Sequence, residues 1–153
     1  MLQWQEDAIY SPGKYKTGFN YTTQSTGKLI TYLSPDLVPL EMRKLIAATN
    51  KKLTTANIDS EQKHPISIAA YFHNRFMEIH PFEDGNGRIG RIFMNQILLK
   101  KGFAPIFITP TDRTQYLKLF EISDSNNLKP MQDFFEDMLI ASLKTKKEFA
   151  RNI

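Results

Sequence analysis

Hydrophobic positions recur at helical spacing over most of the chain, and the first part departs from this pattern. From Pro35 onward, apolar residues return every three or four positions, which is typical of helices that bury one face. Before Pro35, turn-forming and β-forming residues dominate, and residues 20–32 predict a β-hairpin with Ser25, Thr26 and Gly27 at its tip. The pattern therefore predicts a mainly helical, all-α body with one small hairpin.

Five helices are predicted, and several begin or end at a residue suited to that place. The first follows a cap at Ser34 or Asp36 and ends near residue 53, the second covers 65–79, the third covers 88–101, the fourth follows a cap at Thr111 and ends near 122, and the last starts at Pro130. The buried stripe of the first helix is expected at Leu37, Leu40, Leu45 and Ile46. Gly102 is the expected stop of the third helix, because glycine adopts the left-handed cap conformation easily.

The composition describes one globular domain without disulfides. The chain has 153 residues, 41% apolar content and no cysteine, which excludes thiolate nucleophiles, disulfides and cysteine metal sites. A chain of this length builds a core without a disulfide or a structural zinc. Its apolar runs are far shorter than the about 20 residues that span a bilayer, and the N-terminus shows no signal-peptide pattern. We therefore expect a single cytoplasmic domain over residues 1–153 with no membrane association.

The charge and the histidines argue against two further classes of function. Lys and Arg number 20 against 16 Asp and Glu, a net charge of +4, and no long basic run is present. A nucleic-acid partner is therefore not expected. His73 lies seven positions before His80, which is too far for one tetrahedral metal centre without a third ligand, so His73 is interpreted as a structural residue.

Residues suited to phosphate chemistry gather between the second and third predicted helices. The segment reads His80-Pro81-Phe82-Glu83-Asp84-Gly85-Asn86-Gly87-Arg88-Ile89-Gly90-Arg91. The Gly85-Asn86-Gly87 loop can adopt left-handed backbone angles and present N–H groups to one point at the positive end of a helix, as an anion site requires. Arg88 and Arg91 are three positions apart, so both would extend this site to further phosphates.

Two more residues of the segment would complete a transfer site. Asp84 precedes the glycines, where a carboxylate could share a Mg²⁺ ion with bound phosphates. His80, at the end of the preceding helix, could accept a proton from an incoming hydroxyl. Each feature alone is common in turns and solvated helix faces, but their combination favours phosphoryl or nucleotidyl transfer.

The segment resembles the signature of the Fic (filamentation induced by cAMP) domain family, H-P-F-x-[D/E]-G-N-G-R-x-x-R, and matches every position of it. Residues 13–16, 65–79, 102–105 and 112–116 resemble other parts of such domains. The resemblance implies a Fic-type helical fold with a hairpin flap. It also implies a protein adenylyltransferase that uses ATP and Mg²⁺ to attach AMP to a Ser, Thr or Tyr hydroxyl of a target protein.

The resemblance implies a role for each candidate residue. His80 would be the general base, Asp84 the Mg²⁺ ligand, and Phe82 a core anchor. The nucleotide would be held by the backbone of Gly85 to Gly87, the side chain of Asn86, and the side chains of Arg88, Arg91, Tyr116 and Asp124. The flap would dock an extended segment of the target protein through backbone hydrogen bonds at Tyr21, Thr22, Thr23, Lys28, Leu29 and Ile30.

Departures from the family pattern leave alternatives open. Lys16 stands where the family often has Arg. Leu117 and Asp124 stand where some members contact adenine, so another nucleotide is an alternative. No glutamate fits the self-inhibitory pattern [S/T]-x-x-x-E-[G/N], so inhibition would come from a separate protein, from a helix in a missing N-terminal region, or from elsewhere. Removal of AMP from a modified protein and a catalytically silent nucleotide-binding module are the remaining alternatives.

Overall fold

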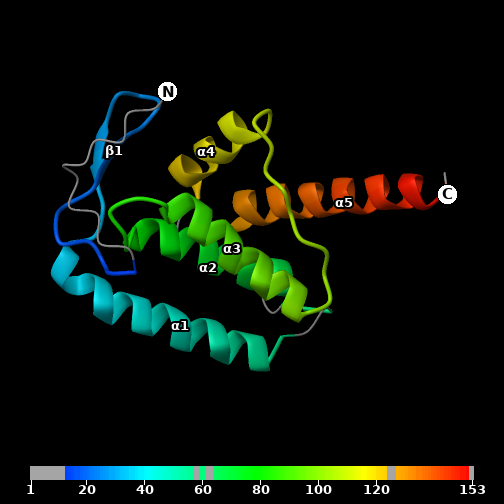
Figure 1. Cartoon of the computed structure of the whole chain (residues 1–153), viewed down its shortest axis with the longest axis horizontal. Helices are drawn as coiled ribbons and strands as arrows, with labels where there is room; N and C mark the ends of the chain where they lie inside the picture. Colours follow the sequence, from blue (N-terminus) through cyan, green and yellow to red (C-terminus); the bar gives the residue numbers. More distant parts are fainter. Residues whose placement is uncertain (1–12, 57–58, 61–63, 124–126, 152–153) are drawn as a thin grey trace.

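The computed structural model describes residues 13–56, 59–60, 64–123 and 127–151, and there it places five α-helices after a two-stranded hairpin (Figure 1). The elements in chain order are β1 (Tyr21–Thr23), β2 (Leu29–Thr31), a 3-10 turn (Pro35–Leu37), α1 (Val38–Thr54), α2 (Pro65–Ile79), α3 (Asn86–Lys100), α4 (Arg113–Ile122) and α5 (Lys129–Arg151). The predicted all-α class with a small hairpin is confirmed. None of the described helices combines the length and the apolar character that crossing a membrane requires.

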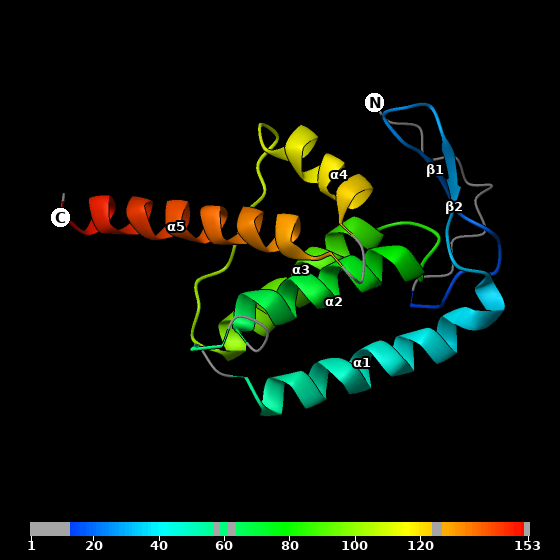
Figure 2. The same cartoon turned by 180° about the vertical axis from the view of Figure 1, so that it is seen from behind.

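Helices α2 and α3 form the centre of the molecule. They pack side by side, with α1 and α5 against α2. The hairpin and α4 lie near the end of α2 and the start of α3 (Figures 1 and 2). The core between the helices contains the fully buried side chains of Phe76, Ile79, Met94, Leu98 and Phe135. Because burying one such side chain contributes about 1.5–3 kcal/mol, this packing fixes the relative positions of the two helices.

Gly90 permits the close contact between α2 and α3. A Cβ atom at this position would lie 3.1 Å from two atoms of the His73 ring and 3.2 Å from the Phe76 ring. Both rings are buried, so neither can move aside without disturbing the core. The absence of a side chain at Gly90 therefore sets how near the two helices approach.

The buried stripe of α1 differs from the prediction. Leu45 is buried as expected, but Leu37, Leu40 and Ile46 are 42–47% exposed. The helix begins only at Val38, and the face toward α2 is formed by Val38, Met42, Leu45, Thr49 and Leu53. The predicted cap is also wrong, because the Ser34 hydroxyl hydrogen-bonds to the Asp36 carboxylate instead of to a helix N–H group.

Three other helix starts differ from the prediction, that of α5 by one residue, since it begins at Lys129 and not at Pro130. Helix α3 begins at Asn86, two residues before the predicted start at Arg88. Helix α4 follows Asp112, and not Thr111, as its N-cap residue. The Asp112 carboxylate accepts a hydrogen bond from the Thr109 N–H at 2.9 Å, which closes a turn immediately before the helix.

Candidate active site

His80 ends α2 in an unusual backbone conformation. Its φ angle is 49°, and it is the one non-glycine residue with positive φ in the described part of the chain. Such a conformation costs of order 1–3 kcal/mol and persists where surrounding contacts hold it. Here the His80 N–H donates to the Phe76 carbonyl at 2.9 Å, and the carbonyl of Pro81 accepts from the Lys16 N–H at 2.8 Å. The chain direction after α2 is therefore fixed from both sides.

The segment of residues 16–20 holds the motif loop from outside. The Lys16 ammonium group, 3% exposed as a residue, donates to the Ile79 carbonyl at the end of α2 at 3.4 Å. The Asn20 amide donates to the Phe82 carbonyl at 3.0 Å, and the Thr17 N–H donates to the Glu83 carboxylate at 3.1 Å. Burial lowers the pKa of Lys16, and the charge of Glu83 opposes this shift. A lysine is sufficient at this position, where the family often has Arg, because the Ile79 carbonyl accepts from a single N–H donor.

Asn86 closes the motif loop from inside. Its side-chain oxygen accepts from the Phe82 N–H at 2.9 Å, and its amide donates to the Phe82 carbonyl at 2.7 Å. The residue is 2% exposed. The structure thus turns the Asn86 side chain onto the loop backbone, and its contact with a phosphate stays a prediction. Phe82 itself is half-buried and packs against the core, as an anchor should.

A turn at Gly85 leads into α3. Gly85 has a φ of 82°, whereas Asn86 and Gly87 already belong to the helix, so the left-handed conformation expected for the loop occurs at Gly85. The Ile89 N–H donates to the Gly85 carbonyl at 3.0 Å. The N–H groups of Asn86, Gly87 and Arg88 lie in the first turn of the helix, where the helix itself provides no acceptor for them. This end of α3 can therefore bind an anion.

The predicted residues gather around one cavity of about 540 Å³. Its lining includes His80, Asp84, Gly85, Asn86, Gly87, Arg88, Arg91 and Tyr116. Arg88 and Arg91 fold back toward the helix start, because ideal Cβ atoms at Gly85 and Gly87 would lie 3.6 and 3.4 Å from their guanidinium nitrogens. Asp124 lies outside the described residues. The structure therefore brings together all of the described candidates except the flap residues.

Arg113 is a lining residue that the sequence analysis missed. It stands at the start of α4 and contributes a third arginine to the same cavity, together with Thr109 and Pro110. The preceding segment is fixed to α3 because the Asn95 side chain bonds both the N–H and the carbonyl of Ile106, at 2.8 and 2.9 Å. Sequence spacing carries no signal for Arg113, since only the fold brings α4 over the start of α3.

The His80 imidazole is neutral, with a defined tautomer. Its Nδ1 lies 3.3 Å from the Met77 carbonyl, and because a carbonyl only accepts, Nδ1 carries the proton. Burial lowers the pKa of His80 to about 4, and the charge of Lys16 adds to this effect. The Tyr32 ring stacks on the imidazole at 3.8 Å with an interplanar angle of 10°. Nε2 is therefore unprotonated at neutral pH and can accept a proton.

Tyr116 and His73 lie behind the arginines. Tyr116 is 3% exposed, and its hydroxyl is 2.6 Å from Nε2 of His73, which is fully buried. Burial raises the pKa of Tyr116 to about 12, and the Arg91 guanidinium group opposes the rise. His73 thus has a hydrogen-bonding partner in the interior of the protein. Within the residues that the structure covers, no group of three or more His, Asp or Glu side chains could hold a metal ion.

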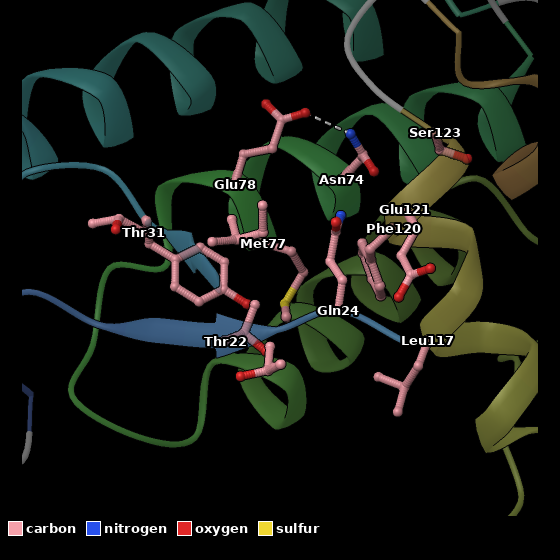
Figure 3. A pocket seen from close by; sticks show the side chains of 13 residues that line it. Thr22, Gln24, Thr31, Asn74, Met77, Glu78, Leu117, Phe120, Glu121 and Ser123 are labelled. Atoms are coloured by element: carbon pink, nitrogen blue, oxygen red, sulfur yellow. Dashed lines mark hydrogen bonds between the residues drawn. The ribbon is translucent and has the colours of Figure 1, made fainter. Parts of the chain in front are cut away.

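The hairpin borders a second cavity of about 460 Å³. Tyr21 pairs with Thr31, Thr22 with Ile30 and Thr23 with Leu29, whereas Lys28 lies in the turn between the strands. Figure 3 shows Met77 from α2, Phe120 from α4 and Gln24 from the hairpin pointing into this space. Met77, Leu117 and Phe120 also line the first cavity, so the two cavities adjoin.

The hairpin tip is attached to α4. Both the N–H and the hydroxyl of Ser25 donate to the Glu121 carboxylate, at 2.8 and 2.7 Å. These two bonds lower the pKa of Glu121. We call this pair the Ser25–Glu121 latch. Glu121 also lines the second cavity, so the latch lies at the edge of this cavity.

Sequence comparison matches the chain to one family and to a group of curated proteins. The sequence profile of the Fic/DOC family matches residues 2–98. The protein adenylyltransferase Fic of Nematostella vectensis is 38% identical over 96 residues, which cover 63% of this chain and 22% of that protein. Its namesake in Drosophila persimilis is 36% identical over 78 residues, 51% of this chain and 15% of the relative. The chain therefore spans less than a quarter of the length of either relative.

Solved structures share the fold. A Fic-domain-containing signalling protein from Bacteroides thetaiotaomicron superposes with a TM-score of 0.78 at 30% identity, over 90% of this chain and 55% of that one. The N-terminal Fic domain of a VirB-translocated Bep effector protein from Bartonella quintana, solved with bound ADP, superposes with a TM-score of 0.56 at 25% identity. That match covers 78% of this chain and 60% of the other.

Proposed function

The chain belongs to the Fic/DOC family, and we propose on that premise that it transfers AMP from ATP to a Ser, Thr or Tyr hydroxyl of a target protein. One observation carries the proposal. His80, whose Nε2 is unprotonated, lines the same cavity as the start of α3 and three arginines. A base beside a polyanion site is the arrangement that transfer of a nucleotide to a hydroxyl needs. The names of the curated relatives support the same activity.

The phosphates of the nucleotide would bind at the start of α3. The N–H groups of Asn86 and Gly87 and the positive end of the helix dipole suit the α-phosphate, where charge develops during transfer. Arg88 and Arg91 would bind the outer phosphates, since guanidinium groups bind phosphate oxygens with two parallel hydrogen bonds. Arg113, from the start of α4, would contact the same phosphates.

The base of the nucleotide would occupy the adjoining second cavity. Its lining by Ile30, Tyr32, Met77 and Phe120 suits a flat ring, because apolar and aromatic side chains stack on a base of any identity. The ADP in the Bartonella quintana domain supports a nucleotide as the ligand. Specificity for adenine is part of the proposal, and another base is the alternative that binding measurements would reveal.

Asp84 would hold the magnesium ion together with the phosphates. Its carboxylate is exposed at the cavity rim, 3.2 Å from an Arg88 nitrogen. Mg²⁺ in such sites is bound by one or two carboxylates with substrate phosphates and water, so a single carboxylate fits this donor set. When bound, the ion would neutralise phosphate charge.

In the proposed reaction, the hydroxyl oxygen of the target attacks the α-phosphorus, and Nε2 of His80 takes the hydroxyl proton. The bond between the α-phosphorus and the bridging oxygen breaks, and pyrophosphate leaves. A pKa of about 4 makes His80 by itself a weak base. The negative nucleotide would raise this pKa, because a nearby anion favours the imidazolium form. Binding of the first substrate would thus prepare the base.

The target would dock on the hairpin. Tyr21, Thr22, Thr23, Lys28 and Leu29 are exposed, so backbone groups at the free edge of this small sheet can pair with an extended segment. Tyr32 continues β2 and stacks on His80, which connects the docked segment with the base. The inhibitor that the sequence analysis expects from another protein or segment would act at Arg91, where it would compete with the outer phosphate.

Incubation of the chain with Mg²⁺, α-labelled ATP and a lysate tests the proposal. A labelled protein band that disappears with the His80→Ala variant is the expected result. Nucleotide binding without any label on protein would instead favour a silent binding module. Loss of AMP from a pre-labelled protein, at a rate above that of the His80→Ala control, would favour the reverse reaction.

A further inference from the structure

The ring of Tyr32 lies nearly parallel to the imidazole of His80. The two ring centroids are 3.8 Å apart, and the planes are inclined by 10°. Tyr32 directly follows β2 and His80 ends α2, so this contact joins the hairpin to the candidate base. Both residues are half-buried, and the position of one ring therefore limits the movement of the other.

The stack restrains a rotation of His80 that its hydrogen bond leaves loose. The bond from Nδ1 to the Met77 carbonyl is 3.3 Å long, beyond the usual range for an N–H···O bond. Rotation of a histidine ring about its Cβ–Cγ bond has broad minima, so the side chain alone does not fix the plane of the ring. With Tyr32 against one face, such a rotation would drive the edge of the imidazole into the tyrosine ring. The stack thus fixes the direction in which Nε2 points.

Two further contacts hold Tyr32 to the backbone on either side of the base. The Tyr32 N–H donates to the Asn20 carbonyl at 3.1 Å, and the Asn20 amide donates to the Phe82 carbonyl at 3.0 Å. The Lys16 ammonium group lies 6.0 Å from the centroid of the Tyr32 ring, at the outer limit of a cation–π contact, and it donates to the Ile79 carbonyl at 3.4 Å. The tyrosine ring therefore keeps its place relative to the residues before and after the base.

We propose that Tyr32 is a positioning residue, which holds the plane of the His80 imidazole so that Nε2 faces the hydroxyl of a docked target. The inference rests on the proposed function, since it concerns the base of the transfer reaction. Because Tyr32 follows the strand that would dock the target, one short segment would set both the place of the target and the direction of the base. Alignment of the reacting groups before the reaction lowers its barrier.

Labelling rates of two Tyr32 variants test this role. The probe is α-labelled ATP with Mg²⁺ in a lysate, and varying the ATP gives a limiting rate and a KM for ATP. Tyr32→Leu removes the flat ring, so the limiting rate should fall at least about tenfold, as for a misplaced catalytic group. The KM for ATP and the affinity for a non-hydrolysable analogue should change much less, because leucine keeps an apolar side chain at the border of the second cavity.

Tyr32→Phe keeps the ring and should keep most of the limiting rate. Burial raises the pKa of Tyr32, so its hydroxyl is uncharged at neutral pH and this variant changes no charge beside the base. Tyr32→Met, with an unbranched apolar side chain and no flat ring, serves the same comparison if Tyr32→Leu does not fold. This rescue by phenylalanine separates the stacked ring from the hydroxyl.

A spectroscopic measurement reports the stack itself. The ring current of Tyr32 should shift the imidazole proton resonances of His80 upfield, and comparison with His80→Ala assigns these resonances. The shift should persist in Tyr32→Phe and disappear in Tyr32→Leu. The matched control is Tyr71→Leu, because the Tyr71 ring also lies near an ammonium group, that of Lys52 at 4.8 Å, but lines neither cavity. It should change neither the labelling rate nor the His80 resonances.

The possible results separate the two proposals. If the unmodified chain labels no protein, the proposed function fails and this inference fails with it. If labelling depends on His80 but Tyr32→Leu labels at the full rate, only the inference fails. Equal losses of rate in Tyr32→Phe and Tyr32→Leu would also overturn it, because the hydroxyl would then be needed and not the stacked ring. A loss of analogue affinity as large as the loss of rate would overturn it as well, since the ring would then support the nucleotide and not the base.

Discussion

The motif loop and the hairpin border the same pair of cavities but are held in opposite ways. Lys16 and Asn20 hold the loop from outside and Asn86 closes it from inside, mostly through backbone groups. The hairpin exposes nearly all of its residues and is attached to the helices chiefly by the Ser25–Glu121 latch and the Tyr32–His80 stack. Under the proposed function, transfer would need fixed atoms and docking of an extended segment would need free backbone, and the two regions suit these two requirements.

The largest expected effect is that of His80→Ala on transfer. Loss of the base should lower the transfer rate at least about 100-fold, while the phosphate site, formed by other residues, keeps its affinity. Labelling and nucleotide titration measure the two quantities separately. His80→Asn is the control for backbone strain, since asparagine tolerates the left-handed conformation better than alanine. A fully active His80→Ala protein would contradict the role of this residue.

The next prediction concerns acid, which should affect the buried His73 and the Ser25–Glu121 latch in different pH ranges. Burial holds the pKa of His73 at about 4, against 6.5 in the unfolded chain. As the pH falls, His73 is protonated in the unfolded chain before it is protonated in the folded one. The free energy of unfolding is therefore highest above pH 6.5 and decreases between pH 6.5 and pH 4, by up to about 3 kcal/mol. The carboxyl of Glu121 has a lowered pKa, so the latch is complete above pH 4.5 and is lost as the pH falls through that lowered value.

Denaturant titrations from pH 7 to pH 4 measure this acid dependence. His73→Gln, which cannot titrate, should show a weaker dependence than the unmodified protein. If the free energy of unfolding depended on pH identically in both proteins, the His73 imidazole would not be the group responsible.

A smaller effect is expected from opening the loop clamp. Asn86→Ala leaves the N–H and carbonyl of Phe82 without their side-chain partner, which should cost about 1–3 kcal/mol of unfolding free energy and weaken nucleotide binding. Asn95→Ala is a matched control, because Asn95 makes the same pair of bonds to Ile106. Both variants should lose similar stability by denaturant titration, but the loss of binding should be larger for Asn86→Ala. Equal binding losses would show that the loop needs no clamp of its own.

The smallest effect is expected at the hairpin. Glu121→Gln keeps the shape of the side chain but weakens the latch, and because this contact is exposed, stability should hardly change. The Michaelis constant for a target should change more than that for ATP, since the latch orders the docking strand and not the phosphate site. Steady-state labelling with each substrate varied in turn would reveal the opposite order, and that result would contradict the division between the two regions.

The contrast between the regions also explains what the sequence could predict. Periodicity gave the helices, and the spacing of His80, Gly85 and Arg88 predicted a shared site because these residues are neighbours in the chain. Local spacing contains no information about Arg113 or the Tyr32 stack, which come from α4 and from the hairpin. Contacts between distant segments depend on the packing of whole helices.

Two further features could not be predicted from local spacing. The sequence does not show that the Asn86 side chain bonds both the N–H and the carbonyl of Phe82. The buried stripe of α1 was misassigned because this helix has apolar residues on its exposed face, Leu40 and Ile46, and a polar residue, Thr49, on its buried face.

The shortness of the strands has a kinetic consequence. Each strand has three residues, a length of about 10 Å, so a guest peptide paired there gains only two or three main-chain bonds. With a net contribution of about 1 kcal/mol each, these bonds alone give weak, rapidly reversible association. We therefore expect a modified protein to leave quickly, and the hairpin to favour repeated turnover over tight capture.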